Sequence, residues 1–108
     1  MKKIRIYISG PISGRPKEEY LAHFAEAAAS LRTQGFKPVN PTTMFGIFQP
    51  LFNRVPYKYQ VLIDCLALAR CQRIYLLSGW SHSRGARLER TIAAWLDIPE
   101  SFNLYNSR

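Results

Sequence analysis

Strand-like and helix-like segments alternate along the whole chain, and this alternation restricts the fold more than any other feature. The sequence predicts strands at 3–9, 36–40, 73–78 and 102–105 and helices at 17–34, 57–70 and 83–96. In the first helix, apolar side chains recur at i, i+4, i+7, i+8 and i+11 from Tyr20 to Leu31. Strands that alternate with helices are typical of a parallel sheet with right-handed crossovers. We therefore predict one α/β domain over residues 1–108, with a parallel sheet of four to five strands flanked by helices.

Composition limits what kind of protein this domain is. Hydrophobic residues make up 47% of the 108 residues, which is enough for one core in a domain of ordinary size. No run of about 18 apolar residues occurs, and the apolar stretch at the start is too short for a signal peptide, so we expect a cytoplasmic protein without a membrane span. Cys65 and Cys71 lack the spacing of a metal site, so we expect reduced thiols, no metal and no cofactor.

The charge balance favours phosphate-bearing partners. The net charge is +8, from 15 basic and seven acidic residues, and such a balance attracts anionic ligands. The basic residues are scattered along the chain rather than clustered in a tail. A solvated basic surface is therefore the alternative interpretation, and binding to nucleic acid is not favoured.

The predicted helix 57–70 is apolar on nearly all sides. Its apolar residues include Val61, Leu62, Ile63, Leu66, Ala67 and Leu68. A helix of this kind is buried on two sides, which in so small a domain indicates a subunit interface. We predict at least a homodimer formed through this helix.

The segment 41–56 is predicted to be a long loop, and loops of this length in small domains are usually functional or mobile. It carries three aromatic residues, Phe45, Phe48 and Phe52. Two interpretations stay open. The rings stack on a nucleobase, or they pack over the edge of the sheet, where Pro38 is expected to place the second strand.

Two acidic residues lie among apolar neighbours, where an unpaired carboxylate is unfavourable. Glu89 falls, at about 100° per residue, in the middle of a helical arc made of Gly85, Ala86, Leu88, Ile92, Ala93, Trp95 and Leu96. Asp64 falls in the arc of Tyr57, Val61 and Leu68. Carboxylates in such surroundings are paired, protonated or functional.

For both carboxylates a structural interpretation stays open. Glu89 would then reach solvent or meet an arginine, and Asp64 would pair with Arg70 or Arg73. If both instead face one crevice, two carboxylates in different environments can divide the roles of nucleophile and acid in cleavage at an anomeric carbon.

Three segments are expected to meet where the predicted strands end, because ligands of open parallel sheets bind outside the carboxyl ends of the strands. These segments are 10–15, 40–41 and 79–85. Two of them are rich in glycine and serine and lead into helices, whose N-termini suit phosphate. Ser81 and Ser83 are also suitable N-caps. The sequence lacks the G-x-S-x-G and G-x-G-x-x-G motifs, so serine hydrolysis and dinucleotide binding are not favoured.

The motifs of the chain resemble a known family. Four parts of the sequence carry this resemblance: the opening strand Ile6-Tyr7-Ile8-Ser9-Gly10-Pro11, the segment Val39-Asn40-Pro41, Asp64, and the segment Ser83-Arg84-Gly85-Ala86-Arg87-Leu88-Glu89. Together they are similar to the DUF4406 family of small proteins and, through it, to the nucleoside 2-deoxyribosyltransferase-like superfamily. The resemblance covers nearly the whole chain and implies a flavodoxin-like (Rossmann-like) fold.

The resemblance also implies roles for particular residues. Glu89 would attack C1′ of a deoxyribose, Asp64 would assist at the sugar or base, and Tyr7 would hydrogen-bond the nucleophile. Arg15 or Arg84 would supply charge for a 5′-phosphate. The substrate- and phosphate-binding residues would be Ser9, Gly10, Pro11, Ile12, Ser13, Gly14, Arg15, Asn40, Gly79, Trp80, Ser81, Ser83 and Gly85.

From the sequence we therefore expect an N-glycosidic-bond enzyme that acts on a deoxynucleoside or its 5′-monophosphate, either as a deoxyribosyltransferase or as a nucleotide N-hydrolase. Two alternatives stay open. One is a nucleotide-binding sensor without catalysis, and the other is a basic adaptor that binds nucleic acid, for which binding would fall steeply with salt.

Overall fold

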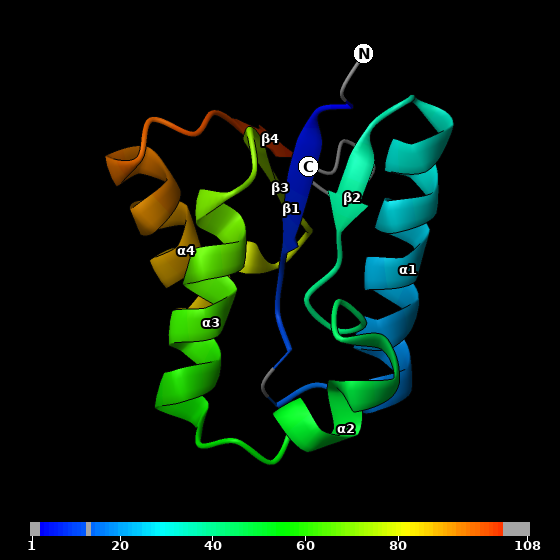
Figure 1. The fold of residues 1–108 in the computed structure, drawn as a ribbon, viewed down its shortest axis with the longest axis vertical. Helices are drawn as coiled ribbons and strands as arrows, with labels where there is room; N and C mark the ends of the chain where they lie inside the picture. Colours follow the sequence, from blue (N-terminus) through cyan, green and yellow to red (C-terminus); the bar gives the residue numbers. More distant parts are fainter. Residues whose placement is uncertain (1–2, 13, 103–108) are drawn as a thin grey trace.

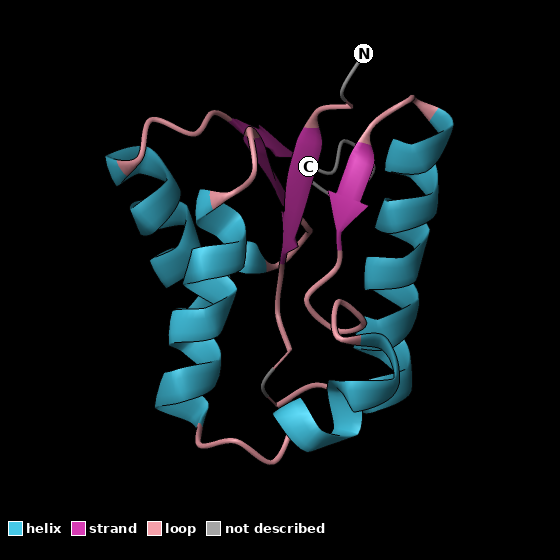
Figure 2. Cartoon of the chain, in the orientation of Figure 1, coloured by secondary structure: helices cyan, strands magenta, loops and turns pink. Residues whose placement is uncertain are grey.

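The computed structural model describes residues 3–12 and 14–102 and shows an α/β domain (Figures 1 and 2). Its strands are β1 (Arg5–Ser9), β2 (Lys37–Val39), β3 (Arg73–Leu76) and β4 (Glu100–Phe102). Its helices are α1 (Lys17–Thr33), α2 (Gln49–Phe52), α3 (Tyr57–Ala69) and α4 (Arg84–Trp95), with short 3-10 turns η1 (Gly46–Phe48) and η2 (Trp80–His82). No helix in this described part of the chain is long and apolar enough to cross a membrane.

The four described strands form one parallel sheet in the order β2-β1-β3-β4. Helix α1 covers one face of the sheet, and α3 and α4 cover the other (Figure 1). This order is that of a flavodoxin-like fold, and it confirms the predicted parallel α/β architecture. Strands β2 and β3 lie on opposite sides of β1, so the carboxyl ends of β1 and β3 flank the switch point where ligands of such sheets bind. Pro38 lies in an edge strand, as predicted.

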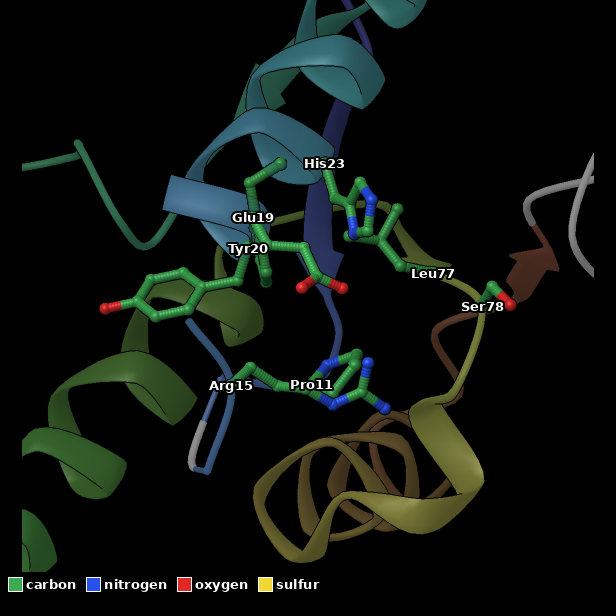
Figure 3. A pocket seen from close by; sticks show the side chains of 8 residues that line it. Pro11, Arg15, Glu19, Tyr20, His23, Leu77 and Ser78 are labelled. Carbon is green, nitrogen blue, oxygen red and sulfur yellow. The ribbon is translucent and has the colours of Figure 1, made fainter. Parts of the chain in front are cut away.

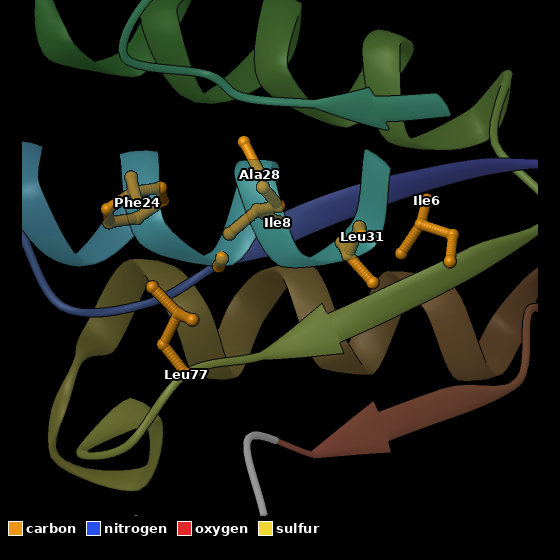
Figure 4. Packing of buried hydrophobic residues seen from close by; sticks show 7 residues of the cluster. Ile6, Ile8, Phe24, Ala28, Leu31 and Leu77 are labelled. Carbon is orange, nitrogen blue, oxygen red and sulfur yellow. The ribbon is translucent and has the colours of Figure 1, made fainter. Parts of the chain in front are cut away.

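The core is divided by the sheet into two layers because alternate side chains of a strand point to opposite faces. Ile6 and Ile8 of β1 pack with Leu77 against the buried stripe of α1 (Figure 4). That stripe consists of Phe24, Ala27, Ala28 and Leu31, which confirms the helical periodicity read from the sequence. On the other face, Tyr7, Leu68, Cys71, Ile74, Leu76 and Ala93 form the second layer. Tyr7 and Ser9 therefore point toward α4, the helix that carries Glu89.

The structure corrects one predicted loop and the start of one predicted strand. The predicted loop 41–56 contains η1 and α2, because the Gln49 side chain accepts a hydrogen bond from the Phe45 amide (3.2 Å) and donates one to the Pro41 carbonyl (3.3 Å), and Pro50 occupies the first turn of α2. The last strand begins at Glu100 rather than at Phe102, and residues 103–105 of the predicted strand lie outside the described part of the chain.

The arc of α4 that was predicted to be apolar is only partly inside. Ala86 and Ala93 are buried, whereas Leu88, Leu96 and above all Trp95 (85% exposed) lie at the surface. Helix α4 contacts the sheet with a narrow stripe, in which Glu89 lies between the two buried alanines. The carboxylate therefore points to the sheet because of its position in this stripe and not because its whole side of the helix is buried.

Gly10 is the point where the chain leaves β1 against the core. A methyl group at this position would lie 2.9 Å from both Cβ and Cδ1 of the buried Leu77 side chain. We expect Gly10→Ala to lower the free energy of unfolding by about 1–3 kcal/mol, because the core must move to accept the extra carbon. Urea denaturation measures this change, with Ala22→Ser on the exposed face of α1 as the control. A midpoint equal to that of the wild type would contradict the expectation.

Candidate active site

A cavity of about 510 Å³ lies at the switch point of the sheet. The loop after β1, the first two turns of α3, and the segment from η2 into α4 enclose it. Its lining residues are Gly10, Pro11, Ile12, Arg15, Tyr57, Gln60, Val61, Asp64, His82, Ser83, Arg84, Gly85, Ala86 and Glu89. The cavity is within the size range of small-molecule sites. Its basic residues lie on the loop after β1, in η2 and at the start of α4, and its two acids lie further along α3 and α4.

Glu89 is held by two hydroxyl groups at the end of β1. The Tyr7 hydroxyl donates to Oε2 at 2.6 Å, and the Ser9 hydroxyl donates to Oε1 at 2.7 Å. Both donors are fully buried, and they come from alternate positions of one strand, so they reach the same helix. Each oxygen of the carboxylate thus has one short hydrogen bond, and the group still lines the cavity. Neither the solvent-exposed nor the arginine-paired interpretation of Glu89 describes this arrangement.

The hydrogen bonds favour the charged form of Glu89. Burial is the largest effect and raises the pKa of Glu89 above its ordinary value of 4.5, and the hydrogen bonds from Tyr7 and then Ser9 offset part of this rise. Burial, and next the charge of Glu89, raise the pKa of Tyr7 well above its ordinary value of 10.0. Tyr7 therefore stays a proton donor in its hydrogen bond to Glu89 throughout the physiological range.

Asp64 lies on the α3 wall of the same cavity without a comparable set of donors. Its Oδ1 atom is buried and has no hydrogen-bond partner among residues 3–12 and 14–102. The alternative interpretation, a pairing with Arg70 or Arg73, does not hold: Arg70 is exposed at the end of α3, and the Arg73 guanidinium donates to the Ser101 hydroxyl at 3.1 Å. Burial, and next the charge of Glu89, raise the pKa of Asp64 from 3.8 to about 7. The two carboxyl groups therefore differ, since Glu89 accepts two hydrogen bonds and Asp64 tends to keep its proton.

The pKa of Asp64 makes stability depend on pH. Because its pKa is about 7 in the folded protein and near 3.8 in its ordinary state, the folded state binds more protons between these values, and stability falls as pH rises through this window. We expect the Asp64→Asn protein to lack this loss of stability with rising pH. It should be more stable than the wild type by about 2 kcal/mol at pH 8.

The measurement for this variant is urea unfolding at pH 5 and pH 8. Glu26→Gln, a change at an exposed acid of α1, is the control and should keep the wild-type pH dependence. An Asp64→Asn protein whose stability falls with pH as steeply as that of the wild type would show that Asp64 is not the titrating group.

The N-terminus of α4 forms the third side of the cavity. The Ser83 side chain caps the helix by accepting a hydrogen bond from the Ala86 amide at 3.2 Å. A Cβ atom at Gly85 would lie 3.2 Å from the Tyr57 hydroxyl, so glycine lets the helix backbone border the opening directly. With Arg84 and Arg15 beside it, this helix start offers free amides and positive charge to an anion.

The predicted site residues divide into three groups. Gly10, Pro11, Ile12, Arg15, Asp64, Ser83, Gly85 and Glu89 line the cavity, and Tyr7 and Ser9 lie directly behind Glu89. Gly14, Asn40, Gly79, Trp80 and Ser81 do not line it. Ser13 lies outside the described residues.

Local interactions explain why two of these residues are elsewhere. The Asn40 side chain accepts hydrogen bonds from the amide (3.0 Å) and the hydroxyl (2.6 Å) of Thr42, so it shapes a turn. The Trp80 ring packs against Phe102 with a centroid distance of 6.2 Å, and the Arg90 guanidinium lies 4.9 Å from its centroid.

The structure adds lining residues that the sequence interpretation missed, among them Tyr57, Gln60 and His82. The helical spacing from Asp64 could have identified the α3 residues, since positions four and seven before it share its face. His82 lies in the segment 79–85 that the sequence predicts at the strand ends, but no local pattern distinguishes it from its neighbours there.

A second, much smaller pocket lies on the α1 side of the loop after β1 (Figure 3). Glu19 and His23 reach into it from α1, and Pro11 and Arg15 border it from the loop, as Figure 3 shows. Its volume of about 10 Å³ is close to that of one water molecule, so it is not a ligand site. Arg15 borders both this pocket and the large cavity.

The aromatic residues of the segment 41–56 do not reach the cavity. The rings of Phe45 and Phe52 lie against each other with a centroid distance of 4.5 Å, Phe48 is 63% exposed, and none of the three lines the cavity. This arrangement favours packing over base stacking for the Phe45–Phe52 pair.

Comparison with known proteins yields a family without an activity. Residues 4–99 match the model of DUF4406, which is described as a domain of unknown function. No curated protein matches the chain. What the site does must therefore be argued from its own geometry.

Proposed function

The chain belongs to the DUF4406 family, and we propose that it breaks the N-glycosidic bond of a deoxynucleoside or of its 5′-monophosphate. The finer assignment to the nucleoside 2-deoxyribosyltransferase-like superfamily is part of this proposal. The observation that carries it is the Glu89 carboxylate, which is fixed by Tyr7 and Ser9 and lines a cavity with a second, proton-retaining carboxyl group, Asp64.

In the first step, a Glu89 oxygen attacks C1′ of the deoxyribose and forms a glycosyl ester. The bond from C1′ to the base nitrogen breaks, and its electron pair goes to the base. Asp64 donates its proton to a ring nitrogen of the leaving base, so the base departs neutral and Asp64 becomes a carboxylate.

In the second step, a water molecule or a second base attacks C1′ and the Glu89 oxygen leaves as a carboxylate. The incoming nucleophile gives its proton to Asp64, which restores the starting state. Two displacements at C1′ give retention of configuration. Water gives hydrolysis, and a base gives transfer.

The surroundings of Glu89 suit this chemistry. The transition state at C1′ resembles an oxocarbenium ion, which a neighbouring carboxylate stabilises before it forms a bond. The hydroxyls of Tyr7 and Ser9 fix the orientation of that carboxylate through buried short hydrogen bonds, so little reorganisation is needed.

The start of α4 supports a phosphate on the substrate. The Ser83-capped helix N-terminus, Gly85 and the guanidinium groups of Arg84 and Arg15 border the cavity that Glu89 lines. A 5′-phosphate placed there would meet backbone amides and positive charge while C1′ faces Glu89.

The test is chromatographic detection of free base after incubation with a panel of deoxynucleosides and their 5′-monophosphates, with and without an acceptor base. We expect base release, and an acceptor that becomes glycosylated identifies a transferase. Mass spectrometry of the acid-quenched reaction should show the protein with one deoxyribosyl group, or deoxyribosyl phosphate, on the peptide that contains Glu89. Nucleotides that stabilise the protein but stay intact would instead identify a binding protein. Absence of both base release and stabilisation by nucleotides would reject the site.

We also propose that two copies of the chain associate through α3. Tyr59, Leu62 and Leu66 are 47%, 60% and 66% exposed and lie on one side of this helix, while Leu68 on another side is buried. Apolar residues grouped in this way typify contact surfaces. We expect sedimentation velocity at micromolar concentration to give the mass of a dimer, and Leu62→Lys with Leu66→Lys to give a monomer. A monomeric wild type would contradict the proposal.

A further inference from the structure

Gln60 is held in one orientation on the α3 wall of the cavity. Its Nε2 atom donates to the Asn53 carbonyl at 3.1 Å and to the Val55 carbonyl at 2.7 Å. Carbonyl oxygens can only accept hydrogen bonds, so the amino end of the side chain must face both of them. Gln60 therefore has one polar atom left for a ligand, the acceptor Oε1.

Gln60 shares the α3 wall of the cavity with Asp64. In the part of the chain that the structure describes, no hydrogen bond to Gln60 Oε1 is formed, and Gln60 lines the cavity. Asp64 lies one helical turn further along α3, where i and i+4 side chains are neighbours. Its Oδ1 is buried and has no partner in the described part of the chain, and burial raises the pKa of the carboxyl group to about 7, so a large fraction of the molecules carries this proton at neutral pH. The same wall thus offers an acceptor, Gln60 Oε1, and a donor, the Asp64 carboxyl group, from residues one helical turn apart.

From this juxtaposition, which rests on the proposed function, we infer that Gln60 is a specificity-determining residue that selects bases with an exocyclic amino group beside a ring-nitrogen acceptor. The amino group would donate to Gln60 Oε1 while Asp64 donates to the ring nitrogen. Adenine offers this pattern with its 6-amino group and N7, and cytosine offers it with its 4-amino group and N3.

At the edge where adenine and cytosine carry this amino group, the oxo bases have the wrong pattern. Hypoxanthine and guanine place a carbonyl oxygen where the amino group of adenine would be, so two acceptors would face each other. Uracil and thymine have an oxygen at C4 and a hydrogen on N3, so both contacts are lost. A site that leaves such polar groups unpaired discriminates against the mismatched base.

The decisive measurement compares bases that differ in this group alone. Base release from dAMP is measured in competition with dIMP, and from dCMP in competition with dUMP. We expect the amino member of each pair that is turned over to be preferred by about 10- to 100-fold in kcat/KM. Equal rates within a pair, or preference for the oxo member, would overturn the inference.

The variant Gln60→Met separates recognition from support. Methionine has a similar length but no acceptor of comparable strength and no amide to bind the Asn53 and Val55 carbonyls. We expect the preference for dAMP over dIMP to fall to within about 3-fold, and the preference for dCMP over dUMP to fall less, because uracil still offers no ring-nitrogen acceptor to Asp64. If Gln60→Met slows both substrates equally and leaves the preference unchanged, Gln60 only supports the α2–α3 connection, and the assignment is contradicted.

Binding to the Glu89→Gln variant distinguishes this inference from the proposed function. Calorimetric titration with dAMP, dIMP, dCMP and dUMP measures recognition without turnover. Tighter binding of the amino members, with no base release by the wild type, would support the role of Gln60 and reject the glycosidic chemistry. Base release without discrimination between amino and oxo bases would support the glycosidic chemistry and reject the role of Gln60. Absence of both binding and base release would reject the role of Gln60 and the proposed function.

Discussion

Glu89→Gln should reduce the rate of base release by at least about 10⁴-fold while the protein stays folded, because the amide has the shape of the carboxylate but is not a nucleophile. One amide atom can still accept a hydrogen bond from Tyr7 or Ser9, whose hydroxyls now hold Glu89 at 2.6 and 2.7 Å. We therefore expect the cavity to keep its form and much of its affinity for the nucleotide. The measurement is single-turnover base release by chromatography, together with loss of the glycosylated peptide in the mass spectrum.

The matched control for this variant is Glu26→Gln, which makes the same change at an exposed position of α1. It should release base at the wild-type rate. Circular dichroism and thermal unfolding of both variants show whether the fold is intact. A Glu89→Gln protein with wild-type turnover would end the proposed mechanism, whereas an inactive but folded protein that still binds nucleotide would support it.

The second large effect is expected from removal of both hydroxyl donors, in the double variant Tyr7→Phe and Ser9→Ala. These hydrogen bonds lower the pKa of Glu89 against the effect of burial, so their loss raises that pKa. Because only ionised Glu89 attacks C1′, the acid limb of the pH profile of kcat/KM should move to higher pH. At neutral pH we expect a fall of about 10²-fold or more, which combines lost ionisation and lost orientation.

Each single variant should show part of this shift, and the two effects should not simply add, since both donors act on one carboxylate. Tyr59→Phe removes a hydroxyl from an exposed tyrosine of α3 and should leave the pH profile unchanged. An equal rate loss at all pH values, with the acid limb in its original place, would mean that Tyr7 and Ser9 support the fold and do not tune Glu89.

Helix α1 and the carboxylates illustrate what could be predicted. The repeat from Tyr20 to Leu31 faces the core over its whole length, because helix α1 buries one continuous stripe against one sheet face. Glu89 and Asp64 stand out in the sequence because the chain has few acids and these two interrupt apolar surfaces. Such a conflict between residue type and position marks functional sites.

The misses have physical reasons of their own. Trp95 was counted with the inward arc, but a helix on a sheet buries only the residues nearest the strands, and Trp95 is 85% exposed. Asn40 was placed in the site by its position after a strand, yet its side chain is used by the Thr42 turn. The short helix α2 is stabilised by contacts of Gln49 across the loop, which no local periodicity reveals.

The sequence by itself determined the alternation of strands and helices, the parallel sheet, the edge position of β2 and the two acids to suspect, because each depends on spacing along one segment. Only the tertiary structure decided what those acids meet. Tyr7 and Ser9 are 82 and 80 residues from Glu89, and they reach it because β1 passes beneath α4. The free acceptor of Gln60 likewise exists only because the chain before α3 turns its carbonyls toward that side chain. Contacts between distant segments depend on how the layers pack, and packing is a property of the whole fold rather than of any one segment.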